Sequence, residues 1–166
     1  TYDKFEIIIV DDGSQDNTSN LINEFILSNP KVKIKIISQK NSGLPTARNI
    51  AIANSKYDYI AILDHDDLWA SNKLYEQVKQ INKNKNCVLF FSDFKYLNYK
   101  SSMTSRFQTA IEKDNYDPSY LNLNKEKGFI HLSLLGCFIG SSTVIFNKNI
   151  LNDIVKFNTE FLFLTD

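Results

Sequence analysis

The residues best suited to chemistry in this chain are the carboxylates of Asp64, Asp66 and Asp67, which directly follow an apolar run at residues 59–63. Carboxylates this close repel one another, so gathering them at the end of a strand needs a physical reason. A divalent cation supplies one, because Mg²⁺ and Mn²⁺ favour carboxylate oxygens and take further ligands from water and substrate phosphates. A solvated turn that caps the next helix explains the same residues, and the spacing leaves both interpretations open.

A second acidic turn lies near the start of the chain, in the stretch VDDGSQDNT. Asp11 and Asp12 come at the end of an apolar run, where a carboxylate can accept hydrogen bonds from a bound base or from ribose hydroxyls. Gly13 allows a backbone conformation with positive φ, and Ser14 can hydrogen-bond the turn. Because Asp, Gly and Ser are all turn formers, an ordinary strand-to-helix turn is the simpler interpretation of this stretch taken alone.

Arg48 is the third candidate, in a chain whose only other arginine is Arg106. On a helix near the binding edge of a sheet, a guanidinium can stack on a base or pair with Asp11 or Asp12. An ion pair on the protein surface explains this arginine equally well, so the residue type alone does not decide its role.

Alternating strand-like and helix-like runs must position these side chains. Runs of β-branched or alternating apolar residues predict strands at residues 6–10, 32–37, 59–63, 87–91 and 142–146. Capping residues followed by apolar residues at helical spacing predict helices at residues 19–28, at residues 47–54, and from residue 71 or 72 onwards. This alternation predicts an α/β fold with a mostly parallel sheet covered by helices.

Both acidic turns follow predicted strands at their carboxyl ends, where ligands bind in sheets of this kind. We therefore expect Asp11–Asp12 and Asp64–Asp67 to line one edge of the sheet. In the helix predicted at residues 19–28, an apolar stripe should occupy one face. Its members are Leu21, Ile22, Phe25 and Ile26.

The composition narrows the class of protein. The chain has 166 residues, 43% of them hydrophobic, and a net charge of zero, which predicts one compact domain and disfavours nucleic acid as a partner. Cys87 and Cys137 lie in apolar runs and are expected to be buried thiols in a reducing compartment. No apolar run approaches the roughly 20 residues that a membrane span needs, so we expect a cytoplasmic domain.

Taken together, two stretches resemble a known family. The sequences IIIVDDGSQDNT and NSGLPTARNIAIANSKYDYIAILDHDD closely resemble the nucleotide-binding half of family-2 glycosyltransferases, which have the GT-A fold. The later stretch CFIGSSTVIFNK resembles that family's acceptor-side strand more weakly. The resemblance implies a Rossmann-like, mostly parallel sheet flanked by helices.

The resemblance also implies an activity, which is inverting transfer of a sugar from a nucleotide-sugar donor, commonly a UDP-sugar, to an acceptor hydroxyl. The acceptor would be a saccharide or a lipid-linked molecule, in the synthesis of surface polysaccharide or glycoconjugates. Such an enzyme would act in the cytoplasm or at the inner face of the membrane. The cofactor implied is Mn²⁺ or Mg²⁺. The donor sugar, the base, the acceptor and the oligomeric state are not fixed by these residues.

Carried over by position, the resemblance assigns roles to the candidate residues. Asp12, with Asp11 as its neighbour, would contact the base. Arg48 would help to hold the base, and Asp64 would reach the ribose or the sugar. The metal ligands would be Asp66 and Asp67, which lie in the same turn as Asp64.

The catalytic base that the resemblance implies is Asp166, with Thr165 where family members usually have Glu. Family members also begin with one more strand and continue past the catalytic carboxylate. The chain is therefore expected to be a single partial GT-A domain. Residues 1–92 would form its nucleotide-sugar-binding part and residues 93–166 its acceptor-side part.

Three other classes of protein are also compatible with parts of this sequence. A sugar nucleotidyltransferase shares the sheet and the acidic metal site, although its glycine-rich phosphate loop is not seen. A phosphoacceptor signalling domain also places Asp residues after strands, but it needs a Lys–Pro pair that the prolines of this chain do not provide. A non-catalytic binding module is the third alternative, and an assay of sugar transfer would separate it from an enzyme.

Overall fold

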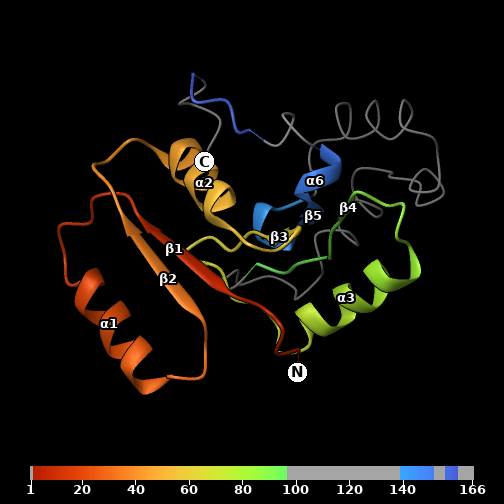
Figure 1. Cartoon of the computed structure of the whole chain (residues 1–166), viewed down its shortest axis with the longest axis horizontal. Helices are drawn as coiled ribbons and strands as arrows, with labels where there is room; N and C mark the ends of the chain where they lie inside the picture. Colours follow the sequence, from red (N-terminus) through yellow and green to blue (C-terminus); the bar gives the residue numbers. More distant parts are fainter. Residues whose placement is uncertain (1, 97–138, 152–155, 161–166) are drawn as a thin grey trace. The chain divides into compact units, whose positions relative to one another are not determined.

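The computed structural model describes residues 2–96, 139–151 and 156–160, in which strands and helices alternate as predicted (Figure 1). The elements are β1 (Ile7–Asp11), α1 (Thr18–Ser28), β2 (Ile34–Ser38), α2 (Leu44–Asn54), β3 (Tyr59–Ala61), α3 (Lys73–Lys83), β4 (Leu89–Phe90), β5 (Ile145–Asn147) and α6 (Lys148–Leu151). The chain forms two compact units, one of Thr1–Ile60 with Asn147–Asp166 and the other of Ala61–Phe146. The division into a donor part and an acceptor part at residue 92 stays a prediction.

In the first unit, β1 and β2 pair in parallel, in the register that places Ile7 opposite Ile34 and Asp11 opposite Ser38. The carboxyl ends of both strands therefore meet at one edge, and the turns that follow them are neighbours. The backbone N–H of Gln39 continues the pairing by donating to the carbonyl of Asp11 at 2.9 Å.

The apolar stripe predicted on α1 lies on one face of the helix, and only half of it is covered. Ile22 and Ile26 are half-buried, whereas Leu21 is 58% exposed and Phe25 is 51% exposed. Residues four apart share a row on a helix, so these residues form two rows about 100° apart. Only the row of Ile22 and Ile26 is covered in the structure.

Helix α2 begins one turn earlier than predicted, because Gly43 at its N-cap has a φ of 86° and Pro45 fits the first turn. The helix packs on β1, and Ala47 is buried there. The side chain of Asn49 donates to the carbonyl of Phe157 and accepts from its N–H, each at 2.8 Å. This pair of hydrogen bonds joins α2 to a segment more than a hundred residues later.

A second sheet has the order β3-β5-β4. β4 and β5 are antiparallel, so the described strands include an antiparallel pair as well as the parallel pair β1–β2. Ile145 and Phe146 are buried at 3% and 5% exposure, and Ile81 of α3 is buried in the same unit.

The strand predicted at residues 142–146 begins later than expected. Ser141–Thr143 instead form a turn of 3-10 helix, closed by the N–H and the hydroxyl of Thr143, which donate to the carbonyl of Gly140 at 2.9 and 2.6 Å. Threonine hydroxyls compete in this way with the ladder bonds of a strand. The strand therefore starts only at Ile145.

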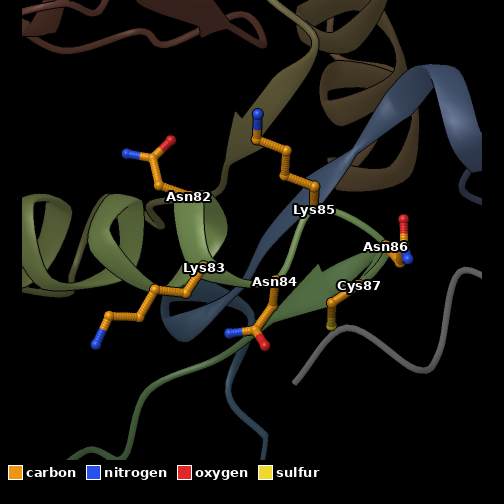
Figure 2. Close-up of a pocket in the computed structure, with 6 residues that line it drawn as sticks. All are labelled: Asn82, Lys83, Asn84, Lys85, Asn86 and Cys87. Carbon is orange, nitrogen blue, oxygen red and sulfur yellow. The ribbon is translucent and has the colours of Figure 1, made fainter.

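The thiol of Cys87 is exposed, so the prediction that it is buried is wrong. It lies in the turn between α3 and β4, where the backbone N–H of Cys87 donates to the carbonyl of Asn84 at 2.9 Å. Figure 2 shows the pocket at this turn, where the lining residues in the described part of the chain are the consecutive residues 82–87. None of the predicted site residues within the described ranges lines it. Cys137 lies outside the described residues.

Replacing Gly13 by alanine should destabilise the first unit. Gly13 has a φ of 86°, and an added Cβ would lie 2.9 Å from the backbone nitrogen of Asn41. Strain of this kind costs about 1–3 kcal/mol in the free energy of unfolding, measured by urea denaturation. Gly140→Ala is the matched control, because its φ is −77° and the added Cβ would meet Phe94 and Thr143 at 3.6 Å. Equal losses of stability in the two variants would contradict the prediction.

Candidate functional site

The first acidic turn, in the first unit, is held by hydrogen bonds from its own neighbourhood. Asp11 is only 8% exposed, and its carboxylate accepts from the backbone N–H of Ser14 at 2.9 Å and from the hydroxyl of Ser19 at 3.1 Å. Hydrogen bonds from the side chain and backbone of Ser14 lower the pKa of Asp11 against the opposing effect of burial. Asp11 therefore joins the end of β1 to the start of α1.

Asp12 joins the turn after β1 to the turn after β2. Its carboxylate accepts from the amide of Gln39 at 2.6 Å and from the backbone N–H groups of Ser42 and Gly43, each at 2.8 Å. Burial raises the pKa of Asp12, but the donors from Gln39, Ser42 and Gly43 outweigh it and the pKa is lowered. Asp12 is thus an ionised group at the N-terminus of α2, where the helix dipole also favours negative charge.

The side-chain oxygen Oε1 of Gln39 is buried and accepts no hydrogen bond within the described part of the chain. It lies on the amide that donates to Asp12, so an unused acceptor stands beside this carboxylate. Gln39 was not predicted, since an isolated glutamine after a strand carries no pattern that would single it out.

Arg48 lies on α2, the helix that packs on β1. Its guanidinium carbon is 5.2 Å from the centroid of the Phe157 ring, a cation–π contact within the first unit. The role of Arg48 toward a nucleotide stays a prediction, as does its pairing with Asp11 or Asp12.

The second acidic turn follows β3 in the second unit. The backbone N–H of Asp67 donates to the carbonyl of Asp64 at 3.2 Å, which closes the turn. The carboxylate of Asp64 accepts from the hydroxyl of Ser141, and its backbone N–H donates to the hydroxyl of Ser142 at 2.9 Å. Asp64 is half-buried, whereas Asp66 and Asp67 are exposed.

The metal site expected at this turn stays a prediction. Among the described residues, no group of three His, Cys, Asp or Glu side chains is placed to hold a metal ion. Asp66 and Asp67 nevertheless present carboxylates to solvent, and no hydrogen bond to either carboxylate is seen in the described ranges. These residues fit a hard divalent cation that takes its remaining ligands from water and a diphosphate, as Mg²⁺ commonly does.

A series of side-chain contacts connects the residues at the start of α3 to the 3-10 turn that binds this acidic turn. The indole N–H of Trp69 donates to the carbonyl of Ser142 at 2.7 Å, and the ammonium of Lys73 lies 4.1 Å from the centroid of the Trp69 ring. Lys73 donates to the side-chain oxygen of Gln77 at 2.6 Å, and the amide of Gln77 donates to the carbonyl of Thr143 at 2.9 Å. Sequence reasoning missed these residues, although Trp69, Lys73 and Gln77 have the four-residue spacing of one helix face.

The predicted site residues are therefore divided between the units. Asp11, Asp12 and Arg48 belong to the first unit, whereas Asp64, Asp66 and Asp67 belong to the second. Each acidic turn follows a strand, as predicted. That both turns line one edge stays a prediction, and the predicted base Asp166 lies outside the described residues.

Comparison with known proteins places the chain in a family. The sequence profile described as Glycosyl transferase family 2 matches residues 1–154. Because this match covers most of the chain, the chain belongs to glycosyl transferase family 2. This is the family that the two stretches near the start of the sequence were expected to resemble.

Curated relatives agree with this assignment. The chain is 30% identical over 152 residues, 92% of its length and 52% of the relative, to the Escherichia coli protein named UDP-Glc:alpha-D-GlcNAc-diphosphoundecaprenol beta-1,3-glucosyltransferase WfgD. It is 29% identical over 118 residues, 71% of its length and 46% of the relative, to the Bacillus subtilis protein TuaG, named for teichuronic acid biosynthesis. The chain thus spans about half the length of these relatives.

Solved structures support the fold. A crystal structure of S. aureus TarS in complex with UDP matches with a TM-score of 0.68 at 21% identity, over 97% of this chain and 43% of that chain. This likeness confirms the predicted GT-A fold. Within the described residues, no helix is both long enough and apolar enough to cross a membrane.

The amine of Lys73 should titrate well below an ordinary lysine, since burial lowers its pKa to about 8. The unfolded chain binds more protons than the folded one between this value and 10.5, so Lys73 adds to stability as the pH rises through that window. The measurement is the pH dependence of acetic anhydride labelling at each lysine, followed by mass spectrometry. Lys79, an exposed lysine on the same helix, is the control. A midpoint for Lys73 close to the ordinary lysine value would contradict the prediction.

Proposed function

We propose that the protein is an inverting glycosyltransferase that moves a sugar from a nucleotide-sugar donor, with UDP as the nucleotide, to an acceptor hydroxyl. The observation that carries this proposal is the match to glycosyl transferase family 2 over residues 1–154, a range that contains both acidic turns. The names of the relatives support UDP, since the E. coli protein is named for UDP-Glc and the TarS structure contains UDP.

The donor-binding residues of this proposal are Asp11, Asp12, Arg48 and Asp64. Asp12 follows β1, and its two carboxylate oxygens are held by donors from the turn after β2, which fixes its orientation. An ionised, oriented carboxylate is suited to accept a hydrogen bond from a base or a ribose hydroxyl. Asp64 has a comparable support in the second unit, where Ser141 donates to its carboxylate.

The metal-binding residues of this proposal are Asp66 and Asp67, whose exposed carboxylates can reach a cation. Bound Mn²⁺ or Mg²⁺ would supply positive charge against the charge that develops on the departing diphosphate. Asp166 takes the proton of the acceptor hydroxyl as that hydroxyl attacks the anomeric carbon, with Thr165 as its neighbour. The nucleoside diphosphate leaves from the opposite face of the sugar, which inverts the anomeric configuration.

The acceptor of this proposal is a saccharide or a lipid-linked molecule of surface polysaccharide or glycoconjugate synthesis. Two relatives support this class, because one is named for a diphosphoundecaprenol acceptor and one for teichuronic acid biosynthesis. A lipid-linked acceptor would place the reaction at the inner face of the membrane, on its cytoplasmic side. In this proposal residues 1–92 bind the donor and residues 93–166 face the acceptor.

Replacing Asp66 by asparagine should remove most of the metal-dependent part of donor binding. The change keeps the size of the side chain but removes the charge that a hard cation prefers. Calorimetry with UDP on the full-length protein, with and without MnCl₂, should show that Mn²⁺ tightens binding at least tenfold in the unchanged protein and little in Asp66→Asn.

The matched control is Asp3→Asn, which makes the same change at an exposed residue outside both acidic turns. It should leave the effect of Mn²⁺ intact. An equal effect of Mn²⁺ in the unchanged protein and in Asp66→Asn would refute the metal assignment, and absence of UDP binding in the unchanged protein would refute the proposed function itself.

A further inference from the structure

The acidic turn after β3 is attached to a turn of 3-10 helix, Ser141–Thr143, that lies more than seventy residues later in the chain. All the contacts between the two turns lie within the second unit. The last backbone hydrogen bond between the two segments runs from the N–H of Ile62 to the carbonyl of Val144 at 3.3 Å. Beyond that bond, hydrogen bonds that involve side chains connect the two segments.

Ser142 holds the acidic segment at both of its ends. Its hydroxyl accepts from the backbone N–H of Asp64 at 2.9 Å, and its carbonyl accepts from the indole N–H of Trp69 at 2.7 Å. Asp66 and Asp67 lie between these two attachment points in the sequence. Ser142 is itself only 7% exposed, so it is a fixed point rather than a mobile surface group.

Ser141 contacts the carboxylate of Asp64 and not its backbone. Its hydroxyl donates to Oδ2 of Asp64, which restricts the rotation of that carboxylate and offsets part of its negative charge. Ser141 is half-buried, so its hydroxyl can be removed or replaced without opening a cavity in the core.

Helix α3 completes the support of the 3-10 turn. The amide of Gln77, which is only 6% exposed, donates to the carbonyl of Thr143 at 2.9 Å. The carbonyls of Ser142 and Thr143 are thus both occupied by side-chain donors from Trp69 and Gln77. The N–H of Asp64 is received by the hydroxyl of Ser142 and not by a backbone carbonyl.

We propose that Ser141 and Ser142 are positioning residues of the donor site, because they fix the carboxylate and the backbone of Asp64 in the geometry that binds the nucleotide sugar. This inference rests on the proposed function, in which Asp64 contacts the donor. The two serines act through Asp64 and touch neither the sugar nor the metal. A hydroxyl bound to an oriented carboxylate keeps it from turning toward its acidic neighbours or into solvent.

A double-mutant cycle tests the role of Ser141. Calorimetry on the full-length protein, with UDP-glucose and MnCl₂ as the probe, should give a Kd about tenfold higher for Ser141→Ala, the size expected for one hydrogen bond to a charged group. The same change made in Asp64→Ala should alter the Kd less than about twofold, because the carboxylate it acts on is gone. Ser141→Thr keeps the hydroxyl and should restore the affinity.

The control is Ser28→Ala, at an exposed serine of α1 whose hydroxyl donates only to a backbone carbonyl of its own helix. Equal losses from Ser141→Ala in both backgrounds, or no loss in the unchanged protein, would overturn the positioning role while leaving the proposed function intact. Unchanged affinity in Asp64→Ala would overturn both the role of Asp64 and the inference that depends on it.

Amide hydrogen exchange tests the role of Ser142. Ser142→Ala removes the acceptor of the Asp64 N–H, so exchange of that amide should accelerate at least tenfold. The amide of Asn84, which donates to backbone carbonyls in the same unit, should keep its rate. Acceleration of both amides would mean a general loss of structure, and an unchanged rate at Asp64 would mean that the hydroxyl does not hold it. Either result would overturn the inference for Ser142.

Discussion

Carboxylates at the ends of strands are held in this molecule by donors from segments distant in the sequence. Asp12, after β1, accepts from Gln39, Ser42 and Gly43, which belong to the turn after β2. Asp64, after β3, is bound by Ser141 and Ser142 across a separation of 77 and 78 residues. In both units, one hydrogen-bonded aspartate ties the turn after one strand to another turn and fixes its own orientation.

This arrangement gives the two acidic turns different electrostatic characters. In the first turn, hydrogen bonds outweigh burial and lower the pKa of Asp12, so hydrogen bonds from the protein itself stabilise the charge. In the second turn, Asp64 has such donors, whereas Asp66 and Asp67 are exposed. The two carboxylates proposed to bind a cation are therefore open to solvent, and the oriented Asp64 lies in the same turn.

Much of the fold was predictable because its signals are local. The β-branched run before Asp11, the glycine at position 43 and the proline at position 45 act within a few residues, and β1, α1, β2 and α2 lie close to their predicted positions. Which apolar side chains are buried was harder to predict from the sequence. Cys87 lies in an apolar run yet is exposed, and Phe25 lies in an apolar stripe yet is half in solvent, because chain path and neighbouring elements decide which apolar residues are covered.

The sequence by itself determined the α/β order, the family and the place of each acidic turn after a strand, since these follow from residue spacing and from motifs of a few residues. Only the tertiary structure decided which side chains support those carboxylates. Gln39, Ser141 and Ser142 belong to no pattern that includes the aspartates they contact, and their partners are set by the path of the chain between them. A hydrogen bond between residues 77 apart leaves no periodic trace in a sequence, because its geometry exists only after the sheet has formed.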